Sequence, residues 1–209
     1  MGTELTVTLE TGLGSIPADA IAGDERAWIE RCQRGDRAAF EPLVQRYMRR
    51  AATFALGWAG NHEDALDLSQ EAFARAFRSI RRFDPERPFY PWFHRILRNL
   101  CINHIGRARH SREMQMEEGM TVCAGDPSPA ERAERAELNR QVRAAIERLQ
   151  PQDREIIILR EFQDQSYAEI AEILQIPKGT VMSRLHNARR RLRAEIERSA
   201  PDLLHREES

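Results

Sequence analysis

The stretch from Ser166 to Arg193 reads SYAEIAEILQIPKGTVMSRLHNARRRLR, and it decides the fold of the second half of the chain. It begins with a capping-box pattern, because the Ser166 hydroxyl can accept a bond from a free backbone amide and Glu169 can return one. Pro177 disfavours helical geometry at the residue before it, so a break is expected there. We therefore predict two short helices joined by a tight turn, a helix-turn-helix.

The helix predicted after Pro177 has one apolar face and one polar, basic face. Apolar side chains recur at three- and four-residue steps, at Val181, Leu185, Ala188 and Leu192. The other face carries Lys178, Thr180, Met182, Ser183, Arg184, His186, Asn187 and Arg190. A DNA major groove about 12 Å wide admits one helix, whose exposed polar side chains then reach base edges. The pattern favours DNA binding over a plain helical hairpin, although the glycine often found in such turns is absent.

The upstream part of the chain, residues 25–112, also has helical periodicity. One helix is predicted around Phe40, Leu43, Val44, Tyr47, Ala51 and Phe54, and another over His62–Ile80, with an interruption from Gly57 to Asn61. Three prolines predict a non-helical loop over Arg82–Pro91 that exposes or half-buries several aromatic rings, and the helical stripe resumes at Trp92. Strand alternation is absent from the sequence. The predicted class is all-α, with two small helical domains.

The chain has 209 residues, of which 31% are charged and 41% hydrophobic. This apolar content can supply packed cores. No apolar run approaches the roughly 20 residues of a membrane-spanning helix, and residues 1–24 contain no Lys or Arg, unlike a secretory signal. We expect a soluble, cytoplasmic protein with a flexible tail over 1–24, a flexible acidic linker over 113–137, a second domain over 138–200 and a tail over 201–209.

The formal net charge of −1 hides a strong segregation of charge. The stretches His94–Ser111 and Lys178–Arg193 are basic and contain no acid, whereas Glu113–Glu137 is acidic. Clustered cations attract polyanions whatever the total charge. Charge alone leaves nucleic-acid binding and two solvated helix faces about equally open.

The sequence gives little support for a catalytic or metal-binding site. Cys32, Cys101 and Cys123 are widely spaced and predict neither a disulfide framework nor a metal site, and Cys101 is expected to be buried. The run HED at residues 62–64 would suggest a helical hydrolase. Neighbouring residues on a helix point in different directions, however, and no second ligand set accompanies them. We expect a non-enzyme without metal, cofactor or small-molecule substrate.

Three motifs, taken in order, resemble a known family. Ser166–Arg193 is similar to region 4 of a bacterial RNA polymerase sigma factor of the extracytoplasmic-function type. The stretch DALDLSQEAFARAF (Asp64–Phe77) resembles region 2.2, and FYPWFHRILRNLCINHI (Phe89–Ile105) resembles regions 2.3 and 2.4. The resemblance covers roughly residues 25–200, without a segment similar to region 3. It implies a factor that binds core RNA polymerase, directs it to promoters and assists promoter melting.

The resemblance implies roles for residues of the first domain. A helix that docks on the clamp helices of the polymerase β′ subunit would present Asp64, Asp67, Gln70, Glu71 and Phe73, with Leu66 in place of a usual acid. Asn99 and Asn103 would read unstacked bases of the minus-ten element, since an amide offers both a donor and an acceptor. Phosphates would be held by Arg95, Arg98, Arg107 and Arg109. A flipped base would be framed by Phe83, Tyr90 and Trp92, whereas Phe93 is favoured as a core anchor.

For the second domain the resemblance implies contacts with the minus-thirty-five element. The candidates are Lys178, Thr180, Ser183, Arg184, His186, Asn187 and Arg190. Met182 stands where many relatives have Lys or Arg, which removes a phosphate or base contact. Asn187 stands where some have Arg, which exchanges a guanine reader for an adenine reader, because Asn pairs best with adenine.

The implied partners are core RNA polymerase (its β′ clamp helices and β flap), promoter DNA and an anti-sigma factor, which would hold an otherwise cytoplasmic chain at the membrane. The acidic linker resembles a connector that threads toward the polymerase active centre. The alternative, that it is a simple tether between the domains, is left equally open. The alternative class is a stand-alone helix-turn-helix regulator with residues 25–112 as a sensor domain. It predicts a dimer that binds duplex DNA tightly without polymerase.

Overall fold

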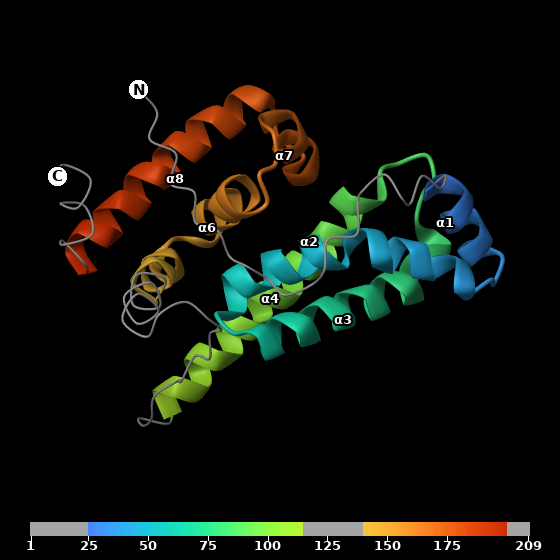
Figure 1. Cartoon of the computed structure of the whole chain (residues 1–209), viewed down its shortest axis with the longest axis horizontal. Helices are drawn as coiled ribbons and strands as arrows, with labels where there is room; N and C mark the ends of the chain where they lie inside the picture. The colour runs from blue at the N-terminus through green and yellow to red at the C-terminus, as the bar shows by residue number, and fades with distance from the viewer. Residues whose placement is uncertain (1–24, 115–139, 200–209) are drawn as a thin grey trace, which may run out of the picture.

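The computed structural model describes residues 25–114 and 140–199, with side chains over 25–107 and 140–198. Within these ranges the chain is helical apart from short connections, as predicted (Figure 1). The N-terminal module comprises α1 (Glu25–Gln33), η2 (Ala38–Phe40), α2 (Glu41–Ala59), α3 (His62–Ser79), η3 (Ile80–Arg82) and α4 (Phe89–Met114). The C-terminal module comprises helical residues 140–148, α6 (Pro151–Ile157), the π-helical turn η4 (Ile158–Phe162), α7 (Tyr167–Leu174) and α8 (Lys178–Ser199).

The N-terminal module is built from α2, α3 and α4, which pack on one another. The corner between α2 and α3 is tight because Gly60 adopts a φ of 80° and ends α2. The Asn61 side chain then accepts a bond from the Asp64 amide at 2.9 Å and begins α3. Between the helices lies an aromatic core, in which the rings of Phe73 and Phe93 stack with centroids 4.3 Å apart. The core role expected for Phe93 is thus confirmed.

The predicted loop over Arg82–Pro91 is wrong at its C-terminal end. Helix α4 already begins at Phe89, whose amide donates to Glu25 Oε1 at 3.0 Å. Pro91 falls in the first turn, where its missing amide would have had no helical partner. The loop also does not expose its rings, because Phe83, Phe89 and Tyr90 are buried.

The C-terminal module contains the predicted helix-turn-helix. The capping box is present: the Glu169 amide donates to Ser166 Oγ at 3.2 Å, and the Ser166 amide donates to Glu169 Oε2 at 2.8 Å. The turn needs no glycine, because Gln175 itself takes the left-handed conformation, with a φ of 56°. Val181, Leu185 and Ala188 are buried, as the pattern of α8 predicts.

The two modules pack against each other, with α7 on α4 and η4 on α2 (Figure 1). One continuous cluster of buried apolar residues runs through both. The predicted interruption over Gly57–Asn61 is confirmed at Gly60 and Asn61 but begins too early, because α2 continues to Ala59 and Gly57 lies at this junction. Among residues 25–114 and 140–199, no helix combines the length and the apolar character needed to cross a membrane. The expected tails, and all but the first two residues of the expected linker, lie outside the described residues.

Candidate polymerase and promoter interface

One edge of α3 and the facing side of α4 enclose a groove of about 400 Å³. Its walls are Asp64, Asp67, Leu68, Glu71, Arg75, Leu100, Asn103, His104 and Arg107. The structure therefore brings three of the acids assigned to polymerase together with Asn103 and Arg107, which are assigned to the minus-ten element. Gln70 is exposed on α3, near this edge in sequence. Phe73 is buried against Phe93 and supports the edge from within.

Two of the three acids of this groove, Glu71 and Asp64, are held by neighbouring groups. Glu71 Oε1 accepts bonds from Arg75 Nε at 2.7 Å and from Arg78 Nη2 at 3.1 Å. The hydrogen bond from Arg75 is the main reason that the pKa of Glu71 lies below its usual range. Asp64 Oδ2 accepts from Asn61 Nδ2 at 2.7 Å and lies 3.5 Å from His104 Nε2. The edge thus presents carboxylates, two of them oriented by neighbouring side chains, which suit a basic partner surface.

Polar side chains of α4 form the second face. Asn99 and Asn103 are both exposed and lie four residues apart, hence on the same side of the helix. Arg95 and Arg107 are also exposed, whereas the side chain of Arg109 lies outside the described residues. Arg98 differs from these, because its Nε lies 2.8 Å from Glu155 Oε1 of the C-terminal module.

The three rings assigned to a flipped base are not equally accessible. Trp92 is half-buried and lies against Phe83, with ring centroids 4.6 Å apart. Phe83 and Tyr90 are 6% and 4% exposed, so neither presents a free ring face in this conformation. The contact of all three with a base stays a prediction.

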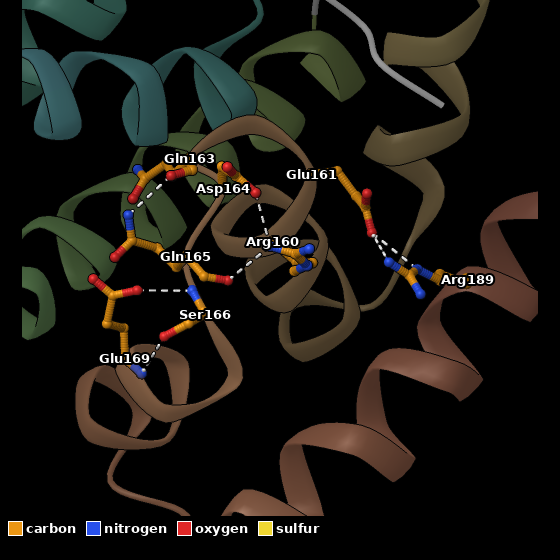
Figure 2. Close-up of polar contacts among 8 residues, drawn as sticks. All are labelled: Arg160, Glu161, Gln163, Asp164, Gln165, Ser166, Glu169 and Arg189. Atoms are coloured by element: carbon orange, nitrogen blue, oxygen red, sulfur yellow. Dashed lines mark hydrogen bonds and ion pairs between the residues drawn. The ribbon is translucent and has the colours of Figure 1, made fainter. Parts of the chain in front are cut away.

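The outer face of α8 is the third surface. Lys178, Ser183, His186 and Arg190 are exposed, and Thr180, Arg184 and Asn187 are half-buried. Two further arginines of the helix have a structural role instead. Arg189 binds Glu161 Oε1 through Nε at 2.9 Å and Nη2 at 2.7 Å (Figure 2), and Arg191 pairs with the buried Asp153. These ion pairs hold α8 on η4 and α6 and fix the direction of its polar face.

Sequence patterns did not indicate the residues that join the modules. Arg154 and Glu155 are 4% and 3% exposed, although a charged run at the start of a helix normally faces water. Gly57, Gln163 and Gln165 take part in the same junction. The one available signal was Gly57, which was assigned to an interruption of the helical pattern, although a glycine inside a helix can also mark close packing.

The fold defines a two-module helical protein whose second module is a helix-turn-helix, and comparisons with known proteins identify its family. Residues 43–111 match the family model "Sigma-70 region 2", and residues 139–192 match "Sigma-70, region 4". The chain is 34% identical to the RNA polymerase sigma-H factor of Pseudomonas aeruginosa, over 77% of this chain and 88% of that one. It is 33% identical to the ECF RNA polymerase sigma factor SigW of Bacillus subtilis, over 80% and 94% of the two chains.

The chain belongs to the extracytoplasmic-function sigma factors of the sigma-70 family. Such a factor directs RNA polymerase to promoters and is not itself an enzyme. The resemblance inferred from the three motifs is thereby confirmed. A family match for each module also removes the reason for treating residues 25–112 as a sensor domain.

Solved structures show the same fold. CnrH, in complex with the cytosolic domain of CnrY, is 25% identical with a TM-score of 0.60, over 85% of this chain and all of that one. The sigma factor RpoE of Bartonella quintana, in complex with the anti-sigma factor NepR, is 23% identical with a TM-score of 0.55, over 76% and 96% of the two chains.

Proposed function

We propose that this sigma factor binds core polymerase through the α3 edge, the minus-ten element through α4 and the minus-thirty-five element through α8. The observation that carries the proposal is the groove between α3 and α4. It joins acids to exposed amide and arginine side chains, so polymerase and melted DNA would meet at one place. Further contacts to the β flap would come from the C-terminal module.

Charge reversal on the α3 edge tests the polymerase contact. Asp67 is exposed, so Asp67→Lys should leave the fold intact. It should lower the affinity for core polymerase at least tenfold, which reduces co-elution. Glu41→Lys, an exposed acid at the start of α2, is the matched control and should co-elute like the wild type. Equal retention of Asp67→Lys and wild type would remove α3 from the interface.

Substitution of the α4 amides separates promoter melting from polymerase binding. Asn99→Ala combined with Asn103→Ala should co-elute normally but lose open complexes on duplex promoters. A template that is already unpaired over the minus-ten element should not rescue the variant, because the bases themselves are no longer read. If duplex and pre-melted templates both support wild-type levels of transcription, α4 has another role.

Asn187 offers the sharpest test of the minus-thirty-five assignment. Asn187→Ala should relax specificity at one base pair by about 1–3 kcal/mol, whereas Arg190→Ala should weaken binding to all sequences alike. Competition among single-base promoter variants distinguishes the two patterns. An equal loss on every promoter for Asn187→Ala would argue against base reading.

We also propose regulation by an anti-sigma factor that covers the polymerase-binding surfaces. The solved relative CnrH supports this, because it assembles with the cytosolic domain of a partner, CnrY. A membrane-bound partner would hold this otherwise cytoplasmic chain at the membrane. Affinity capture with the intact chain, followed by competition with core polymerase, tests the idea. A partner that binds simultaneously with core would contradict it.

A further inference from the structure

Met182 is an exposed apolar side chain on a polar helix. Among residues 25–107 and 140–198, whose side chains the structure describes, two large apolar side chains are exposed, Met182 at 55% and Leu66 at 44%. Met182 lies near the start of α8, the helix whose outer face we propose to contact the minus-thirty-five element. Single exposed apolar residues are common on protein surfaces, so the surroundings of Met182 decide whether it has a role.

The position of Met182 on α8 places it outside the core of the module. Val181 and Leu185, which form the inner face, are buried. Because successive residues of a helix are separated by about 100° around its axis, Met182 stands beside this inner face and not within it. The exposed side of the helix continues from Met182 to Ser183 and His186. Met182 therefore belongs to the edge of the outer face of α8.

The helical turn before Met182 leaves space next to it. Side chains on a helix lean toward its N-terminus, so Met182 lies over the turn that contains Gly179, three residues earlier. Gly179 is exposed, and a Cβ atom built on it would meet no neighbouring side chain or packed element within 4 Å. Met182 thus borders a gap in the side-chain surface of α8, into which the edge of a base can approach.

The side chains around this gap are basic or polar. Lys178 is exposed four residues before Met182, and His186 is exposed four residues after it. Basic side chains bind phosphates, which position a helix on DNA without reading its sequence. A methionine has no hydrogen-bond donor and only a weak acceptor, so it can neither pair with a phosphate nor read a polar base edge. Any contribution of Met182 to DNA binding therefore comes from an apolar contact.

The major groove offers an apolar group on the base edges at one place, the C5 methyl group of thymine. Residues in the N-terminal part of a recognition helix contact base edges, and Met182 lies in that part of α8. Methionine suits such a contact, because its unbranched and polarizable side chain adapts to the position of a methyl group. Burial of one methyl group changes the affinity about fourfold, which corresponds to about 0.8 kcal/mol.

We propose that Met182 is a specificity-determining residue that contacts the C5 methyl group of a thymine in the minus-thirty-five element. The inference rests on the proposed function, because it requires α8 to lie in the major groove. It adds a kind of base reading that the polar side chains of α8 do not supply. Asn187 would distinguish bases by hydrogen bonds, whereas Met182 distinguishes a base that carries a methyl group from one that lacks it.

Uracil interference tests this contact, because deoxyuridine pairs like thymidine but lacks the C5 methyl group. A promoter duplex found by mapping start sites is amplified with a mixture of dTTP and dUTP and bound to the holoenzyme, which is core polymerase with the full chain. Bound and free DNA are separated and then cleaved at uracil. A uracil depleted from the bound DNA marks a thymine whose methyl group contributes to binding. At one or more minus-thirty-five thymines, uracil should lower the affinity of the wild-type holoenzyme about fourfold.

Substitutions at position 182 then assign the methyl contact. Met182→Ala removes the apolar side chain, so thymine and uracil should be bound equally well at that position. Met182→Leu keeps an apolar side chain of similar volume and should retain the preference for thymine. Arg190→Ala is the matched control on the same helix. It should weaken binding to thymine and uracil DNA alike, and the preference for thymine should persist.

A preference for thymine that persists in Met182→Ala would assign the methyl group to another residue and overturn the inference. Weaker co-elution of Met182→Ala with core polymerase would overturn it as well, because Met182 would then face a protein. If the wild-type holoenzyme protects the minus-thirty-five region but no uracil there is depleted, the inference alone fails. If the region is not protected at all, the proposed contact of α8 fails, and the inference fails with it.

Discussion

The two modules bury different chemistry. The N-terminal core is aromatic and contains Phe54, Phe73, Phe89 and Phe93, with Ser69 and His94 as its buried polar residues. The C-terminal core is aliphatic, and it buries three consecutive charged residues, Asp153, Arg154 and Glu155. Asp153 pairs within its own module, whereas the other two bind across the junction. The buried charges of the second module therefore depend on docking, whereas the first module buries mainly rings.

Phe93→Ala should have the largest effect, because the ring is fully buried between Phe73 and Phe89. We expect the free energy of unfolding of the N-terminal module to fall by about 3–5 kcal/mol. The half-buried Phe77, changed to alanine, should cost clearly less. Urea unfolding followed by circular dichroism measures both, and equal losses would argue against a self-contained aromatic core.

Arg154→Ala should lower the free energy of unfolding by about 2 kcal/mol, since it leaves the carbonyls of Gly57 and Trp58 without their donor. The exposed Arg148, changed to alanine, serves as the control and should stay within about 0.5 kcal/mol of the wild type. Urea unfolding followed by circular dichroism measures the free energy of unfolding of both variants. If the two arginines prove equivalent, the C-terminal module does not depend on docking.

His94 should make the junction sensitive to acid. Burial, reinforced by Arg98 and Arg50, lowers the pKa of His94 to about 3, so the folded state binds fewer protons than the unfolded state between that value and about 6.5. Stability is therefore full above pH 6.5 and falls as the pH drops.

Between pH 7 and pH 5, the wild type should lose about 2 kcal/mol more than His94→Phe, which keeps the ring against Phe54 and Tyr90 but cannot titrate. Glu155 lies 3.9 Å from His94 Nδ1 and is present in both proteins. Burial raises its pKa, so it works in the opposite direction and reduces the acid loss of both. Parallel stability curves for the two proteins would refute the assignment to His94.

Ser166→Ala should have the smallest effect, about 1 kcal/mol, because it removes one side of the capping box at the start of α7. Ser166→Asp keeps an acceptor for the Glu169 amide and should recover most of the loss. Thermal unfolding of the intact chain would show the difference, and an unchanged melting temperature for Ser166→Ala would mean that α7 does not need its cap.

Local chemistry explains which parts of the fold the sequence predicts. The capping box at Ser166, the apolar stripe of α8 and the core position of Phe93 depend on neighbours within a few residues, and all three agree with the structure. The start of α4 was misplaced because Pro91 was treated as a breaker, although a proline is tolerated in a first turn. The buried rings of Phe83 and Tyr90 depend on distant helices, which local patterns do not describe.

The site divides in the same way. Helical periodicity predicts which residues of α3, α4 and α8 share a face, whereas the roles of these faces come from the family resemblance and stay predictions. The roles of Arg154, Glu155 and Gln163 were not predicted, since each has its partner about 50 or more residues away in the sequence. Docking between the modules depends on residues far apart in the sequence, and Gly57 is the one residue whose type indicated it.

Mapping transcription start sites with bacterial core polymerase and this purified sigma factor shows whether the chain directs initiation. We expect discrete starts on genomic DNA, with protection of two separated promoter elements that disappears when core is omitted. Starts distributed as with core polymerase alone, or equal protection by the sigma factor without core, would contradict it.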